Sequence, residues 1–102
     1  MAETHFIKTL PHNPLGPVCT AATIHLAASL SNFAQQEFQQ IYLDSFPRDL
    51  FPEAPELSGD CFALPTLPGL GVTFDESVAE QHAFEFWEAP HWQRRDGTHT
   101  NW

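Results

Sequence analysis

The hydrophobic residues of this chain form first a short apolar run and then a helical pattern. Residues 5–10, HFIKTL, are rich in residues that favour β-strands and are followed by Pro11, so they predict a buried or half-buried strand. Residues 16–32 carry Pro17 near their start, many alanines, and apolar side chains on neighbouring helical faces. They predict a helix that is apolar on most sides and therefore largely buried.

A second extended segment follows this helix. Residues 32–38, NFAQQEF, predict a second strand, which gives the order strand, helix, strand. A crossover of this length normally joins parallel strands in a right-handed sense, and the carboxyl ends of such strands meet at one edge of the sheet. We therefore expect His12 and Glu37, which lie at the two strand ends, to be side by side.

The rest of the chain has a different pattern. Residues 45–72 contain five prolines and four acidic residues without a hydrophobic period, which predicts a long ordered excursion or a linker. Within residues 73–87 a final helix is expected, with Asp75 as its N-cap. The apolar stripe of that helix would comprise Val78, His82 and Phe86. The Asp-Gly pair at 96–97 predicts a turn in a small hairpin or an extended tail.

Composition narrows the class of protein. The 102 residues suffice for one small domain, and a hydrophobic content of 42% favours a folded chain over a disordered one. Four basic residues against thirteen acidic ones give a net charge of −9, which disfavours binding to nucleic acid or to anionic membrane surfaces. The start of the chain lacks the pattern of a secretory signal, and no apolar stretch approaches membrane-spanning length. We expect a cytoplasmic protein.

A unit of two parallel strands and one helix is structurally incomplete. It leaves both sheet edges open and one sheet face uncovered. The chain is therefore expected to need a partner, either a missing N-terminal portion or another copy of itself. Whether Met1 is a true start or a truncation stays open.

His12 and Glu37 are the candidates for chemistry. His12 directly follows a strand, where α/β barrels and parallel sheets place their sites, and a histidine exchanges protons near neutral pH. A carboxylate beside an imidazole can hold its tautomer, share its proton or bond a developing oxyanion. The alternatives are a turn histidine that bonds nearby backbone and a surface glutamate.

Other site types find no support in the sequence. The six histidines show no HxxxH or HxH spacing, and His25, on the apolar helix, is expected to be a partly buried histidine with a satisfied hydrogen bond. The glycines of PGLGV at 68–72 lack the spacing of a phosphate loop, and no GxSxG motif is present. We predict neither metal ligands nor cofactor-binding residues in this chain.

Four segments resemble a known family in the same order along the chain. They are PHNPLGPV (11–18), FAQQEF (33–38), LPGLGVTFDE (67–76) and HWQRRDGTHTNW (91–102). They look like the C-terminal part of acid-sugar dehydratases of the enolase superfamily, in the mandelate racemase/muconate lactonizing enzyme subgroup, most similar to galactonate dehydratase. The resemblance implies an α/β fold. Residues 1–43 would be the last strand-helix-strand portion of a modified TIM barrel, and 44–102 an irregular tail with one helix that completes an α+β capping domain.

The resemblance also implies a reaction. In this family the proton α to a carboxylate is abstracted, Mg²⁺ holds the resulting enolate, and the β-hydroxyl is lost. His12 would protonate the departing hydroxyl, and Glu37 would hydrogen-bond the enolate. The metal ligands, the base and the aspartate that pairs with the acid histidine come from earlier strands of the family's barrel and are not in this chain.

Three hypotheses follow. The first is a C-terminal fragment of a magnesium-dependent sugar-acid dehydratase that is inactive alone. The second is a small acidic, non-catalytic binding or assembly module that pairs through exposed strand edges. The third is an enzyme that uses His12 and Glu37 without a metal. The sugar acid stays open, because Asn13 stands where the similar galactonate dehydratases commonly have cysteine.

Overall fold

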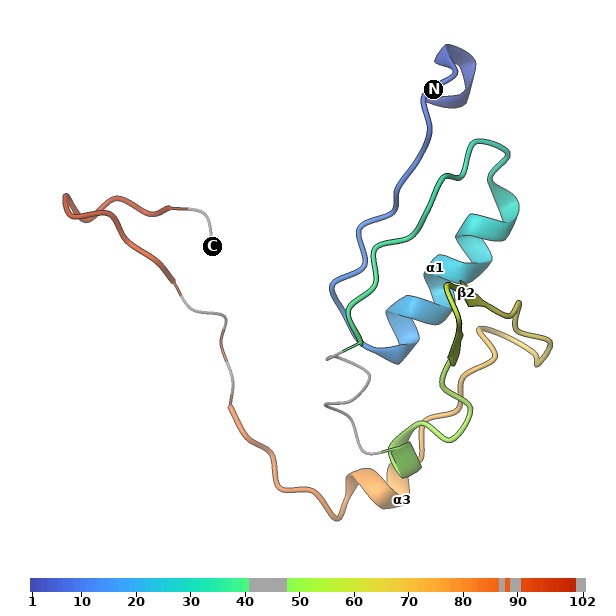
Figure 1. Cartoon of the computed structure of the whole chain (residues 1–102). Helices are drawn as coiled ribbons and strands as arrows, with labels where there is room; N and C mark the ends of the chain where they lie inside the picture. The colour runs from blue at the N-terminus through green and yellow to red at the C-terminus, as the bar shows by residue number, and fades with distance from the viewer. Residues whose placement is uncertain (41–47, 87, 89–90, 101–102) are drawn as a thin grey trace.

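The structure is a computed structural model that describes residues 1–40, 48–86, 88 and 91–100. Helix α1 occupies the middle of the N-terminal part, and two extended segments run along it (Figure 1). In chain order the elements are η1 (Glu3–His5), α1 (Pro17–Ser29), η2 (Arg48–Leu50), β1 (Leu57–Ser58), β2 (Cys61–Phe62) and α3 (Glu76–Ala79). Within the described part of the chain, no helix is long and apolar enough to cross a membrane. The boundary predicted between residues 43 and 44 lies outside the described residues.

The two extended segments that precede and follow α1 in the chain pair in parallel. A parallel bridge joins Thr9 and Phe33. The Thr9 backbone N–H donates to the carbonyl of Asn32 at 2.9 Å, and the N–H of Ala34 donates to the carbonyl of Thr9 at 3.0 Å. Figure 1 shows the N-terminal segment, in blue, beside the green segment that follows α1. The predicted parallel arrangement is confirmed.

The predicted extent of the two strands is wrong. Residues Glu3–His5 form the 3-10 helix η1, and Phe6 follows in a left-handed conformation with φ 57°. Residues 32–38 pair with the first segment as an isolated bridge and not as a regular strand. A two-stranded pair is marginal by itself, so a ladder extends only where further strands or packing support it.

Helix α1 is confirmed, although it ends at Ser29 and not at residue 32. It packs on one side only: its buried residues are Pro17, Thr20, Ala21, Thr23 and Ile24. Val18 and Leu26, on the other side, are exposed. The prediction of burial on most sides is therefore wrong, because the described elements cover only one face of this apolar helix.

Residues 48–72 form an ordered excursion and not a linker. Strands β1 and β2 pair antiparallel, with Leu57 opposite Phe62 and Ser58 opposite Cys61. The two-residue loop between them begins with Gly59 at φ 64°. This hairpin was not predicted, although a Gly-Asp pair between strand residues favours a tight turn of this kind.

The excursion packs against the N-terminal part of the chain. The ring of Phe62 meets the ring of Phe38 edge to face, with their centroids 4.9 Å apart.

Further along, Gly71 has φ 72°, and a Cβ built there would lie 2.6 Å from the Cβ of Pro65. Only glycine fits this position, because both the backbone conformation and the space exclude a side chain.

Helix α3 is capped as predicted but is shorter than predicted. The Asp75 carboxylate accepts bonds from the N–H groups of Ser77 at 2.9 Å and Val78 at 3.2 Å. Since the helix ends at Ala79, His82 and Phe86 do not share a helical stripe with Val78. Phe86 is exposed, and a short helix needs a packed face to extend.

The Asp-Gly turn at 96–97 is confirmed. Gln93 and His99 form an antiparallel bridge around it, and Gly97 takes φ 83°. The Arg94 N–H donates to the carbonyl of Thr98 at 2.8 Å, which closes a small hairpin.

Little apolar surface is removed from water. Within the described residues the buried hydrophobic core consists of Ala21 and Ile24. The accessible surface is 8303 Å², whereas a compact monomer of this length would expose about 5,800 Å². Large exposed side chains include Phe6, Ile7, Leu10, Leu15, Val18 and Leu26. The chain therefore carries apolar surface that further protein could cover.

Truncation of the small core should separate buried from exposed positions on α1. Ile24 is 4% exposed and Leu26 is 48% exposed. We expect Ile24→Ala to cost about 2–4 kcal/mol and to lower the urea midpoint of α1, whereas the matched Leu26→Ala should cost less than about 1 kcal/mol. Urea unfolding followed by far-ultraviolet circular dichroism measures both. Equal losses would contradict the one-sided packing of α1.

Candidate functional site

The candidate site lies where the two paired segments end. The backbone N–H of Glu37 donates to the carbonyl of Pro11 at 3.3 Å, which continues the contact begun at Thr9 and Phe33. This bond places residue 37 against the loop that carries His12. The helix between them starts at Pro17, so the loop is held at both ends.

His12 and Glu37 are in direct contact. Oε2 of Glu37 lies 2.6 Å from Nδ1 of His12. The same oxygen accepts the backbone N–H of Asn13 at 3.0 Å. The His12 side chain is 76% exposed and that of Glu37 30% exposed, so the imidazole is open to a ligand. The predicted juxtaposition is confirmed, whereas the catalytic roles of both residues stay predictions.

Glu37 is held in its ionised form. The hydrogen bond from the Asn13 backbone keeps the pKa of Glu37 below its ordinary value of 4.5, and partial desolvation opposes this effect. The charge and hydrogen bond of His12 and a bond from Gln39 also lower the pKa. An ionised carboxylate only accepts hydrogen bonds, so at neutral pH the His12 Nδ1 is the donor in this contact.

Two buried polar residues that we did not predict support this loop. Asn13 is 1% exposed, and its Nδ2 donates to Oγ1 of Thr20 at 3.2 Å. Thr20 is fully buried on α1, and its hydroxyl donates to the carbonyl of Gly16 at 3.2 Å. The available signal was a polar residue on the buried face of an apolar helix, seven positions after the asparagine.

The remaining histidines do not join this pair. His25 is half-buried, and its Nε2 lies 3.3 Å from the carbonyl oxygen of Leu70, which agrees with its expected structural role. His91 pairs with Glu88 at 2.6 Å, and both are exposed. Among the residues that the structure describes, no group of three or more histidine, cysteine or acidic side chains could hold a metal ion.

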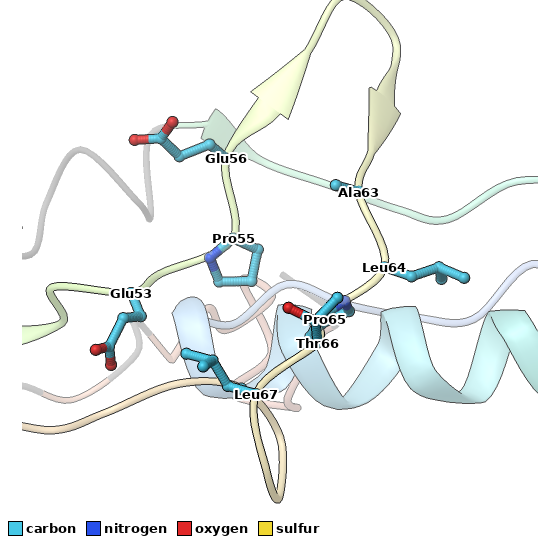
Figure 2. Close-up of a pocket in the computed structure, with 9 residues that line it drawn as sticks. Glu53, Pro55, Glu56, Ala63, Leu64, Pro65, Thr66 and Leu67 are labelled. Carbon is cyan, nitrogen blue, oxygen red and sulfur yellow. The ribbon is translucent and has the colours of Figure 1, made fainter.

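A hollow of about 240 Å³ lies in the excursion and was not predicted. Its walls come from the segments before β1 and after β2, with the carboxylates of Glu53 and Glu56 on one side and Pro65 and Leu67 on the other (Figure 2). Neither His12 nor Glu37 lines it. The hollow is therefore separate from the candidate site.

Comparison with known families gives the affiliation of the chain. Residues 1–78 match the sequence profile of the family described as enolase C-terminal domain-like. The chain belongs to the enolase C-terminal domain-like family. This assignment confirms the resemblance to the enolase superfamily and to its mandelate racemase/muconate lactonizing enzyme group, and it supports the α/β fold class.

The relatives of this enolase-family chain include sugar-acid dehydratases. It is 34% identical over 103 residues to a D-mannonate dehydratase of Caulobacter vibrioides and 32% identical over 111 residues to a D-galactonate dehydratase of Ralstonia pickettii. These matches cover 99% and 100% of this chain but 25% and 28% of the relatives. The chain thus spans about a quarter of the length of the curated relatives it matches.

A solved structure of the same superfamily gives a similar result. The crystal structure of an enolase from Agrobacterium radiobacter, bound to Na and L-malate, superimposes with a TM-score of 0.75 at 27% identity. The match covers 96% of this chain and 28% of that one. The described fold is therefore that of one part of a larger enolase-family structure.

The contact between Glu37 and Asn13 should depend on pH. Because the folded pKa of Glu37 lies below 4.5, the bonds that the carboxylate accepts are fully present above about pH 4.5 and are lost as pH falls through the lowered pKa. We expect the Asn13 amide resonance in ¹H–¹⁵N spectra to titrate with a midpoint below 4.5. Glu37→Gln should abolish this titration and Glu56→Gln should leave it unchanged. A midpoint at or above 4.5 would contradict the assignment.

Proposed function

We propose that this chain supplies the proton-donating side of a sugar-acid dehydratase active site. The observation that carries the proposal is the 2.6 Å contact between Nδ1 of His12 and Oε2 of Glu37 at the ends of two parallel segments. Support comes from relatives named D-mannonate and D-galactonate dehydratase, which match the chain over nearly its full length.

The proposed step is general acid catalysis by His12. Once the base outside this chain has removed the α-proton, the electron pair left at Cα forms the Cα=Cβ double bond. The protonated imidazole gives its proton to the β-hydroxyl, the C–O bond breaks, and water leaves. The exposed face of His12 admits such a substrate. A general acid of this kind contributes about 10² to 10⁴ in rate.

Glu37 takes a supporting role in this proposal. Its ionised carboxylate accepts the bond from Nδ1 of His12 and orients the ring so that Nε2 faces the substrate. The hydrogen bond to an enolate, which the resemblance implies, requires a protonated carboxyl, because a carboxylate has no proton to donate. That role stays a prediction.

The described residues do not fit a magnesium site. They hold no group of three or more histidine, cysteine or acidic side chains that could bind the ion. We propose that the Mg²⁺ of the family reaction and the base that removes the α-proton are held by protein outside this chain. Since each is worth orders of magnitude in rate, the 102-residue chain alone should be inactive.

Complementation tests this proposal. The 34% identical D-mannonate dehydratase, truncated by the quarter that this chain matches, should be inactive with Mg²⁺ on D-mannonate. Co-expression with this chain should restore dehydration, because the missing acid and the missing packing surface are returned together. Turnover of D-mannonate or D-galactonate by this chain alone would contradict the assignment of an incomplete site.

The role of His12 has its own test in the complemented enzyme. His12→Asn should lower kcat by about 10² to 10⁴, since asparagine cannot transfer a proton. The matched control is His82→Asn, at an exposed position outside the site, which should leave kcat within about twofold. Full activity in His12→Asn would refute the role of His12 as the acid.

A non-catalytic assembly module is the second candidate, and the exposed apolar surface favours it. The N-terminal part alone exposes Phe6, Ile7, Leu10 and Leu15. A net charge of −9 opposes self-association, so a partner other than a second copy is the stronger form of this proposal.

The cytoplasmic location expected from the sequence stays a prediction.

Sedimentation analysis measures whether the chain needs a partner. We expect the isolated chain to sediment as a frictionally expanded monomer and to become compact in a complex with the truncated relative, because apolar surface is then covered. A compact monomer would contradict both the partner proposal and the exposed surface.

A further inference from the structure

Asn13 is buried at a position where an apolar residue would be less costly. Its side chain is 1% exposed, and its Oδ1 has no hydrogen-bond partner within the described residues. An unpaired amide oxygen away from water carries a free-energy cost that an apolar side chain of the same branched shape, such as leucine, would avoid. Stability alone therefore does not account for asparagine here.

The two nitrogens of Asn13 connect the candidate site to α1. The backbone nitrogen donates to Oε2 of Glu37 at 3.0 Å, and the side-chain Nδ2 donates to Oγ1 of Thr20 at 3.2 Å. Thr20 is itself fixed, because its hydroxyl donates to the carbonyl of Gly16 at 3.2 Å. The bond to Thr20 thus fixes Asn13, and with it the backbone N–H that faces Glu37, to helix α1. None of these bonds joins α1 directly to His12.

The Glu37 carboxylate bridges two consecutive residues. The same oxygen, Oε2, meets Nδ1 of His12 and the N–H of Asn13. If the Asn13 N–H turns away, the carboxylate loses one of the donors that hold it in place and keeps those of His12 and Gln39. Which ring nitrogen of a histidine carries the proton depends on the bond that the other nitrogen makes. The position of the Glu37 carboxylate therefore determines which ring nitrogen of His12 carries the proton.

We propose that Asn13 is a positioning residue: anchored by Thr20, it orients Glu37, which holds His12 as the Nδ1–H tautomer and leaves Nε2 as the nitrogen that exchanges protons with substrate. The exchange at Nε2 rests on the proposed function. The tautomer does not, because it is a property of the 102-residue chain that can be read without any substrate.

The test reads the tautomer by long-range ¹H–¹⁵N correlation spectra of the histidine rings in the uniformly labelled full chain at mildly alkaline pH. In the unmodified chain His12 should show a protonated Nδ1 and an unprotonated Nε2. The exposed His82 gives the reference for a solvated ring in the same spectrum.

Substitutions at Thr20 separate positioning from packing. Thr20→Val keeps the side-chain volume but removes the hydroxyl that accepts the bond from Nδ2 of Asn13. We expect the ratio of Nδ1–H to Nε2–H in His12 to fall about fivefold, because the hydrogen bond between His12 and Glu37 is then weaker. Thr20→Ser retains the hydroxyl and should keep the ratio within about twofold of the unmodified chain. Thr23→Val is the matched control, since that hydroxyl donates to the Cys19 carbonyl in its own helix and makes no other hydrogen bond within the part of the chain that the structure describes.

Asn13→Leu provides an independent variant. It keeps the backbone N–H and replaces the amide by two methyl groups that cannot donate to Thr20, so it should lower the tautomer ratio even if Thr20→Val loosens α1. Far-ultraviolet circular dichroism checks the helix in each variant. An unchanged ratio in either folded variant, or a His12 ring that matches His82 in the unmodified chain, would overturn the proposal.

The two proposals can fail separately. A failed complementation together with a His12 tautomer that responds to Thr20→Val would refute the proposed function and leave the positioning role of Asn13 intact. Restored dehydration with a tautomer that does not respond would support the function and refute the role of Asn13.

Discussion

The parallel pairing of Thr9 with Asn32 and Ala34 is the contact on which the rest of the site depends. It brings together two segments that α1 separates in the sequence, and it sets their register. The bond from Glu37 to the carbonyl of Pro11 follows from that register. Because side chains alternate between the faces of an extended segment, a slip by one residue would turn Glu37 away from His12.

The site is assembled from polar contacts on a chain that buries little apolar surface. The Glu37 carboxylate is satisfied by His12 and by the Asn13 backbone, and Asn13 is tied to Thr20. Around these bonds, large apolar side chains remain in water. This combination is what one part of a larger barrel would show. Its polar site forms at its own strand ends, whereas its apolar surfaces are covered only when neighbouring elements pack on them.

The electrostatics of Glu37 refine the role that family resemblance implies. A carboxyl group that hydrogen-bonds an enolate has to carry a proton, whereas the contacts in this chain favour the ionised form. The same contacts suit a carboxylate that orients a histidine acid.

Much of the local structure was readable from residue type. The Asp75 cap, the Asp-Gly turn and the start of α1 at Pro17 were predicted correctly, because each depends on neighbours within a few residues. The length of α3 and the extent of the strands were not, because both depend on packing against other elements. Helix α1 was also predicted to be buried on most sides, since its composition does not show how many neighbours it has.

The sequence by itself determined that the chain is an acidic α/β unit with His12 and Glu37 at the ends of two segments. Hydrophobic periodicity predicts the helix, and the rule for crossovers predicts that the segments before and after it are parallel. The tertiary structure alone decided the register that joins their side chains, the lowered pKa of Glu37 and the buried link from Asn13 to Thr20. Hydrogen bonds between residues far apart in the chain depend on atomic distances, and no local pattern of residue types encodes them.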